Sequence, residues 1–241
     1  MRNRFLGIGA VLALGSFAGA DVVLDHITGA VQADWSEIYA SQDFEAAWDE
    51  FDVNYIEDFT VTETQTNILQ VDAIMGGYSG FLNAFFTNGR VRGYRVEFYS
   101  SVATAAASLT GDVGSQTVLP GSVTVGPPLG WRFAESEVRI PVNVFLPGAG
   151  TYWVGVMGIL DYDPGGQIAV VAWNSGTFAG GNNSVQVNPN GGFNFGGGTN
   201  FVDRHRDAAY RITGVPEPAS MVALAMGAAA LVAHRRRKKV A

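Results

Sequence analysis

The 241-residue chain contains no cysteine. It therefore cannot form a disulfide, use a thiol nucleophile or bind a metal ion through thiolates. Secreted domains often use disulfides, but a chain of this length can bury a core large enough to fold without them. The absence excludes thiol chemistry and does not argue against export.

Histidine is also scarce. His26, His205 and His234 lie far apart in the sequence, so no pair has the spacing of a metal-binding motif. His205 stands between Arg204 and Arg206, and two adjacent cations disfavour the uptake of a proton or a metal ion. We expect no transition-metal site.

Catalytic motifs are missing as well. The segment Gly77-Tyr78-Ser79-Gly80-Phe81 lacks the second glycine of the G-x-S-x-G motif of serine hydrolases. A glycosidase needs two carboxylates across a cleft, and a chain this acidic contains many carboxylate pairs by chance. We expect that the protein is not an enzyme, with a secreted hydrolase as the weakest of three functional hypotheses.

Basic residues are rare between residues 21 and 214. This region has eight arginines and no lysine against 21 acidic residues, so its formal charge is −13. Such a surface repels phosphate backbones, which excludes nucleic acid as a partner. It favours cations and basic or neutral partners.

Residues 1–20 have the pattern of a secretory signal peptide. Arg2 and Arg4 supply the positive start, and Phe5–Phe17 is an apolar run too short for a typical permanent span. Ala18-Gly19-Ala20 fits a signal-peptidase site, so we predict cleavage before Asp21 and export through the inner membrane.

Residues 215–241 form a second targeting segment. Val215-Pro216-Glu217-Pro218 keeps the backbone extended around Glu217, because proline fixes φ and disfavours a helix. The apolar run Met221–Ala233 would be about 20 Å long as a helix, short of the ~30 Å hydrocarbon core. Cations follow it and are predicted to stay cytoplasmic: Arg235, Arg236, Arg237, Lys238 and Lys239.

This tail resembles the PEP-CTERM sorting signal of Gram-negative, biofilm-forming bacteria. The motif, the short transmembrane helix and the Arg/Lys cluster occur in the order of that family. The resemblance implies transient membrane anchoring, processing by an exosortase-type membrane protease, and delivery to the cell surface, outer envelope or extracellular matrix. An ordinary single-span anchor is the alternative.

The region 57–214 is predicted to be an all-β domain. Short strands separated by glycine and proline indicate a two-sheet antiparallel sandwich of the jelly-roll-like kind. On the strand Asn67–Met75, alternation places Leu69 on the inward face together with Val71. The predicted strands are Asp58–Thr62, Asn67–Met75, Val91–Ser100, Thr117–Val125 (interrupted near Pro120-Gly121), Val138–Val144, Thr151–Ile159, Gln167–Trp173 and Ala208–Ile212.

Three segments outside these strands are predicted to be irregular. The acidic segment 21–56 is expected to be an irregular or short-helical lead-in that packs on the sandwich, with Phe44 and Trp48 at helical spacing. Residues 101–114 read as a long loop. Residues 174–200 are rich in glycine and asparagine, which predicts a loop too polar to join the core.

The body of the chain also looks like a group of secreted bacterial β-sandwich modules that carry such sorting tails. That group implies no catalytic residues for transfer. The matching pieces are Ser41–Glu45, Glu57–Val61, Val96–Tyr99, Gly150–Val154, Asn188–Phe193 and Ala209–Ile212.

Two candidate ligand sites stand out in the sequence. Asp161 and Asp163 lie two residues apart in a glycine-containing loop that can chelate calcium, although a tight turn explains the same residues. Trp131 follows a proline-rich loop and can stack on a sugar ring, whereas Trp153 and Trp173 lie in apolar strands and are expected in the core.

These observations lead to one functional expectation. We predict an exported surface or matrix protein with a non-catalytic, structural or adhesive β-sandwich. The alternative is a carbohydrate-binding module of the matrix polysaccharide, possible both with and without calcium.

Overall fold

The computed structural model describes residues 20–29, 34–62, 66–78, 89–132, 134–163, 166–174, 182–195 and 200–216, which form the unit Ala20–Pro216. The predicted signal peptide up to residue 19 and the tail from Glu217, with the apolar helix predicted for it, lie outside these residues. Within the described ranges, no helix is long and apolar enough to cross a membrane.

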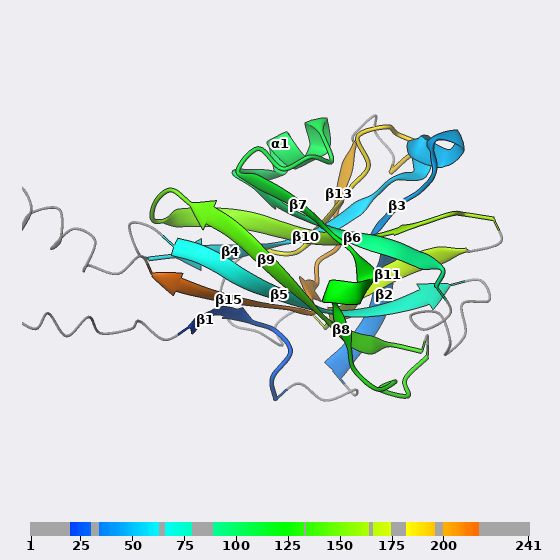
Figure 1. Cartoon of the computed structure of the whole chain (residues 1–241). Helices are drawn as coiled ribbons and strands as arrows, with labels where there is room; N and C mark the ends of the chain where they lie inside the picture. Colours follow the sequence, from blue (N-terminus) through cyan, green and yellow to red (C-terminus); the bar gives the residue numbers. More distant parts are fainter. Residues whose placement is uncertain are drawn as a thin grey trace, which may run out of the picture. The chain divides into compact units, whose positions relative to one another are not determined.

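Two sheets face each other across the core (Figure 1). The eight-stranded sheet contains β1 (Asp21–Asp25), β2 (Trp35–Ala40), β5 (Thr66–Tyr78), β8 (Thr124–Val125), β9 (Ser136–Leu146), β11 (Gln167–Trp173), β14 (Asp207–Ala208) and β15 (Tyr210–Pro216). The seven-stranded sheet contains β3 (Gln42–Asp43), β4 (Asn54–Val61), β6 (Val91–Tyr99), β7 (Gly114–Val118), β10 (Gly150–Leu160), β12 (Val185–Val187) and β13 (Phe201–Asp203). The strand pairs are antiparallel apart from β3 with β10, so the predicted two-sheet antiparallel sandwich is confirmed.

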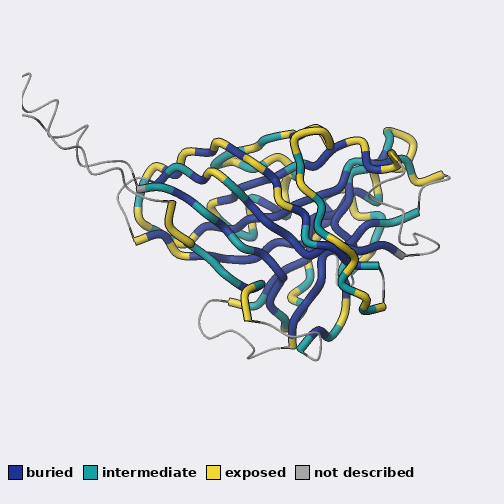
Figure 2. The backbone as a smooth tube through the Cα atoms, turned by 60° about the horizontal axis from the view of Figure 1, so that its bottom comes forward, coloured by how far each residue is buried: buried dark blue, intermediate teal, exposed yellow. Residues whose placement is uncertain are grey.

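The main core lies between the two sheets and follows from alternation along the strands. On β9, Val138, Ile140, Val142 and Val144 are buried while Arg139 between them is exposed. Residues of β4, β6 and β10 meet this face from the other sheet. Figure 2 shows the buried stretches running through the middle of both layers.

The outer face of each sheet carries a second, smaller apolar cluster. On the eight-stranded sheet, Trp35 and Trp173 pack together under the partly buried Trp131. On the seven-stranded sheet, Trp153 packs with Ile56, Tyr99 and Val185, and the helix α1 (Val102–Ala107) lies against this cluster. Central strands are therefore apolar on both faces, as the sequence of β10 predicts.

The structure corrects two predicted irregular segments. The lead-in over 21–56 contains the expected short helical element, the 3-10 helix η2 (Ala46–Phe51), but also β1, β2 and β3. β2 pairs with β11 and points Glu37 outward between the buried Trp35 and Ile38, so its acidity does not prevent strand pairing. The segment 101–114 was predicted to be a loop but contains the helix α1. The side chain of Ser101 caps this helix by accepting a hydrogen bond from the backbone N–H of Thr104.

Two further corrections concern strands. The segment 174–200 was predicted to be a loop too polar for the core, yet it contains β12, which is buried along its whole length between β4 and β13. Leu69 was predicted to face inward, but it is exposed because the register shifts between Ile68 and Gln70. Such a bulge moves one residue out of the alternation.

The first and last strands of the unit are neighbours. Asp21 of β1 lies opposite Gly214 of β15, so the described chain enters and leaves at the same edge of one sheet. Val215 and Pro216 pair with Asn67 and Thr66 of β5. The first two residues of the sorting motif are therefore part of the sheet.

Candidate functional site

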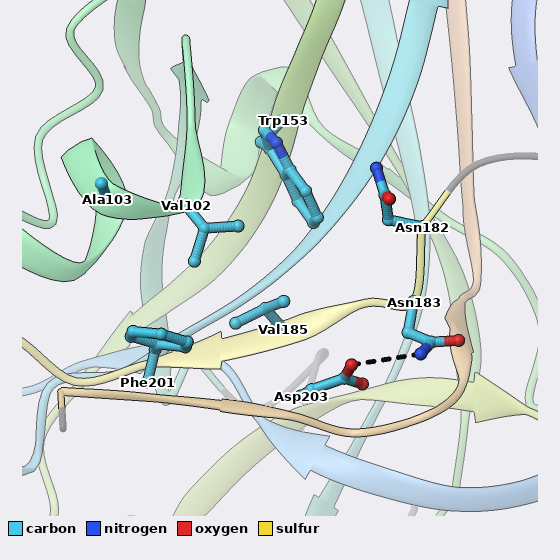
Figure 3. Close-up of a pocket in the computed structure, with 8 residues that line it drawn as sticks. All are labelled: Val102, Ala103, Trp153, Asn182, Asn183, Val185, Phe201 and Asp203. Carbon is cyan, nitrogen blue, oxygen red and sulfur yellow. Dashed lines mark hydrogen bonds between the residues drawn. The ribbon is translucent and has the colours of Figure 1, made fainter.

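A pocket of about 670 Å³ lies over the outer face of the seven-stranded sheet, between α1 and β13. Figure 3 shows its side chains pointing into a shared space. The lining residues are Val102, Ala103, Trp153, Asn182, Asn183, Val185, Phe201 and Asp203. These come from four separate parts of the chain, so only the fold brings them together.

The apolar part of the lining is anchored in the sheet. Trp153 is held on the central strand β10 and is only 8 % exposed. Phe201 lies on the edge strand β13 and is 40 % exposed. The pocket thus offers one fixed aromatic ring and one accessible one.

The polar part of the lining is held by hydrogen bonds. Asn183 Nδ2 donates to Asp203 Oδ2 at 3.1 Å, and the backbone N–H of His205 donates to Asp203 Oδ1 at 2.6 Å. Asn182 binds Asp58 of β4 through its backbone N–H at 2.7 Å. These bonds fix the directions of the amides and the carboxylate before any ligand arrives.

The described side chains that line the pocket are uncharged or acidic. None of the eight described lining residues carries a positive charge, and Asp203 supplies the one carboxylate among them. Asp58 lies behind Asn182, and burial raises its pKa while the Asn182 hydrogen bonds lower it. The arrangement suits a ligand rich in hydroxyl groups and does not suit an anion.

Other carboxyl groups with raised pKa values lie away from this pocket. Burial raises the pKa of Asp52 to about 7, opposed by the hydrogen bond from the Phe44 backbone N–H and reinforced by Asp43 and Asp49. Burial also raises the pKa of Glu57, which is inside the sandwich and 1 % exposed. Neither residue lines the pocket.

The structure places the predicted ligand residues elsewhere. Trp131 is half-buried: its ring packs against that of Trp35 at 5.2 Å between centroids, and the Arg132 guanidinium lies 5.1 Å from its centroid. It does not line the pocket described above. Its role in stacking on a sugar stays a prediction.

The predicted calcium residues also lie apart from the pocket. Asp161 forms an ion pair with Arg92, and Asp163 lies in the turn after β10. Among the residues that the structure describes, no group of three or more His, Cys, Asp or Glu side chains is placed to hold a metal ion. Calcium at Asp161 and Asp163 stays a prediction.

The sorting residues are only partly described. Val215 and Pro216 end β15, whereas Glu217, Pro218 and the cluster Arg235–Lys239 lie outside the described residues. The sequence did not predict the pocket residues because the strands beside or within which they lie, β12 and β13, have only three residues each. These pocket residues are Asn182, Asn183, Phe201 and Asp203. The alternation of Val185, Gln186 and Val187 could have predicted a strand in this region.

In a comparison with protein-family models, residues 214–238 match a model described as the PEP-CTERM protein-sorting motif. The resemblance of the tail is thereby confirmed. Searches of curated proteins and of solved structures give no significant match.

Proposed function

We propose that this chain, which its PEP-CTERM motif marks as an exported protein sorted by an exosortase, is an adhesive protein of the cell surface or extracellular matrix. Its sandwich binds uncharged glycan in the pocket over β10 and does not catalyse a reaction. The observation that carries the proposal is the pocket lining, in which an exposed aromatic ring faces two amides and a carboxylate.

A glycan matches both halves of this lining. A sugar ring has an apolar C–H face that packs on aromatic side chains and hydroxyl groups that bond to amide and carboxylate oxygens. Phe201 offers the accessible face, and Asn182, Asn183 and Asp203 offer the polar partners. The volume of about 670 Å³ lies in the range of small-ligand sites and suits a short saccharide.

Charge supports an uncharged ligand. The region 21–214 has a formal charge of −13, and the described lining contains Asp203 but no basic residue. An anionic polysaccharide would meet repulsion without a compensating cation. A neutral saccharide meets none.

The count of carboxylates supports a binding role without hydrolysis. Glycoside hydrolysis needs two carboxyl groups that face each other across the scissile bond. Asp203 is the one carboxylate among the described lining residues, and its two oxygens accept from Asn183 and from the His205 backbone. Asp203 is thus a hydrogen-bonding residue in this proposal.

Replacing Phe201 with alanine should weaken binding of a neutral oligosaccharide about tenfold or more, because it removes the accessible stacking face. A tenfold loss corresponds to about 1.4 kcal/mol. Titration calorimetry with short, uncharged glucan, galactan, mannan and xylan oligosaccharides measures the effect. Asn183→Ala should act in the same direction by removing a hydrogen-bonding partner.

Phe145→Ala is the matched control for this test. Phe145 is 44 % exposed on β9 of the other sheet, so its removal deletes an equally large surface ring far from the pocket. Binding should be unchanged in this variant. Equal losses in Phe145→Ala and Phe201→Ala, or no binding of any neutral saccharide by the wild type, would contradict a glycan role and leave a structural role as the better account.

Replacing Glu217 with alanine should leave the protein in the membrane fraction of the producing cell. The glutamate is the charged residue of the sorting motif, and the family implies processing near it. Fractionation and immunoblotting of wild type and variant measure the released share, which we expect to fall at least tenfold. Glu50→Ala, which removes an exposed carboxylate of η2, should be released normally; normal release of Glu217→Ala would rule out the sorting role.

A further inference from the structure

A continuous row of aromatic rings lies on the surface around η2. The row begins with Tyr162, which follows β10, and continues through Trp48 and Phe51 of η2 to Phe193 and Phe195 of the loop after β12. Consecutive ring centroids are 4.7, 5.8, 6.0 and 5.9 Å apart. We call these five residues the aromatic row.

The aromatic row is accessible. Trp48 is 36 % exposed and Tyr162 is 38 % exposed, and Phe51, Phe193 and Phe195 are half-buried. η2 has no fully buried residue: Phe51 packs against the edge of the main core, whereas Trp48 lies exposed on the surface. Grouped exposed aromatic side chains typically mark an interaction site.

The backbone beneath the aromatic row is fixed by polar contacts. Asn188 Nδ2 donates to the carbonyl oxygens of Glu50 and Asp52 at 2.9 and 2.6 Å, and Asn188 is fully buried. Asn190 Nδ2 donates to the Asp49 carbonyl at 2.8 Å. These bonds join η2 to the loop 188–195 and hold rings from both segments in line.

Gly192 permits the closest approach between the two segments. Its N–H donates to the Glu50 carbonyl at 2.9 Å, and a Cβ at this position would lie 2.4 Å from that oxygen. Only glycine allows this contact without moving the backbone. The fold therefore presents the rings on a preorganised platform, which lowers the entropic cost of binding.

We propose that the aromatic row binds an extended chain of uncharged polysaccharide, at a site separate from the pocket over β10. Sugar rings pack their C–H faces on the exposed rings of Trp48 and Tyr162, and the half-buried Phe51, Phe193 and Phe195 extend the apolar surface along the polymer. The exposed carboxylates of Asp49 and Glu50 stand beside Trp48 on η2 and accept hydrogen bonds from sugar hydroxyls.

Several kinds of ligand stack on aromatic rings, and the charge of this surface favours an uncharged polysaccharide among them. The carboxylates on η2 and the formal charge of −13 for residues 21–214 repel nucleic acids and anionic lipid surfaces. The length of the row, five rings from three segments, suits a polymer more than a single sugar. The single described cation on it, Arg204, lies 5.4 Å from the Phe195 centroid at its far end.

Affinity electrophoresis in gels that contain soluble neutral polysaccharide tests the proposal. The gels contain hydroxyethyl cellulose, galactomannan, arabinoxylan or agarose, and the full ectodomain 21–216 is the probe. The wild type should be retarded by at least one polymer. Trp48→Ala and Tyr162→Ala should each weaken retention about tenfold or more, and Trp48→Phe should keep most of it because a ring remains.

Two controls separate this site from the pocket and from loss of folding. Phe145→Ala removes an exposed ring elsewhere and should be retarded like the wild type, and thermal unfolding confirms that each variant is folded. Phe201→Ala should lose binding of short oligosaccharides while keeping polymer retention through the aromatic row. If pocket binding fails and polymer retention still depends on Trp48, the proposed function of the pocket is wrong and the aromatic row stands.

Three results would overturn the inference. The first is that no polymer retards the wild type. The second is that Trp48→Ala and Tyr162→Ala are retarded as strongly as the wild type. The third is that Trp48→Ala converts a dimer to a monomer in sedimentation without changing retention, which would assign the aromatic row to a second copy of the chain.

Discussion

The Glu57→Gln variant should be more stable than the wild type at pH 8 and should lose less stability as the pH rises. Glu57 lies on β4 with its side chain between the sheets, where Oε2 accepts from the backbone N–H of Ala208. Burial is the main reason that the pKa of Glu57 is raised well above its usual range, with Asp207 and Asp58 adding to it.

The sign of this effect follows from proton binding. Because the pKa of Glu57 is higher in the folded state than in the unfolded chain, the folded state binds more protons between these two values. Its stabilising contribution is fully present below the unfolded pKa and is lost as the pH rises through the folded pKa. In that window the free energy of unfolding falls by as much as about 1.4 kcal/mol per pH unit for one such carboxyl group.

Urea unfolding at pH 5, 6, 7 and 8 measures the slope. Glutamine keeps the shape and an acceptor for Ala208 but does not titrate, so we expect a flatter curve for the variant. Glu50→Gln, which changes an exposed carboxyl on η2, should keep the slope of the wild type. Parallel curves for Glu57→Gln and wild type would mean that folding does not raise the pKa of Glu57.

Replacing Arg211 with methionine should lower the free energy of unfolding by about 3 kcal/mol, because it leaves a buried carboxylate without its cation. Arg211 Nε donates to Asp72 Oδ2 at 2.8 Å, and the Asp72 side chain is fully buried. Burial raises the pKa of Asp72, while the hydrogen bonds and charge of Arg211 lower it. Methionine retains most of the side-chain volume, so the effect reports the lost charge.

Arg139→Met is the matched control for this prediction. Arg139 is on β9, which pairs with β5 on the side away from Arg211, and it binds Glu137 at 3.0 Å. Its side chain is about half exposed, so its pair contributes only about 0–1 kcal/mol. Adding Asp72→Asn to Arg211→Met should restore part of the loss, because the uncompensated charge is then gone. Similar losses in Arg139→Met and Arg211→Met would show that burial of Asp72 is not the cause.

Much of the fold could be predicted because its strands obey simple alternation. β9 follows the apolar pattern of Val138 to Val144, and β11 has the predicted bounds Gln167–Trp173. Pro141, which cannot donate to a ladder, lies opposite Gln70 of β5 where β9 pairs only with β5, since β8 reaches no farther than Arg139. In these strands the local alternation of apolar and polar residues agrees with the strand pairing of the folded domain.

The missed elements depend on tertiary pairing. β1, β2 and β12 are short and stand in acidic or glycine-rich segments, and each is stabilised by a neighbour distant in the sequence, such as β15, β11 or β4. Periodicity over three to six residues is too weak to predict such strands. The bulge that exposes Leu69 is likewise a property of the pair β5–β9.

The two candidate surfaces could not be predicted for a related reason. The pocket joins α1, β10, β12 and β13, and the aromatic row joins η2, Tyr162 and Phe193, so neither is a local motif. Sequence reasoning favoured Trp131 because it stands in a loop, yet the structure packs its ring on Trp35. Trp48, predicted to belong to a lead-in that packs on the sandwich, is 36 % exposed.

The place of β15 in its sheet has a mechanical consequence. This strand is bonded on one side to β1 from Arg211 to Gly214 and on the other to β5 from Tyr210 to Pro216. A tension applied at Pro216 runs along the strand, so the bonds on both flanks are sheared together. Bonds that share a force resist far more of it than bonds that open one after another. A pull along β15 from Pro216 therefore meets more resistance than a force that peels the strand away from one neighbour at a time.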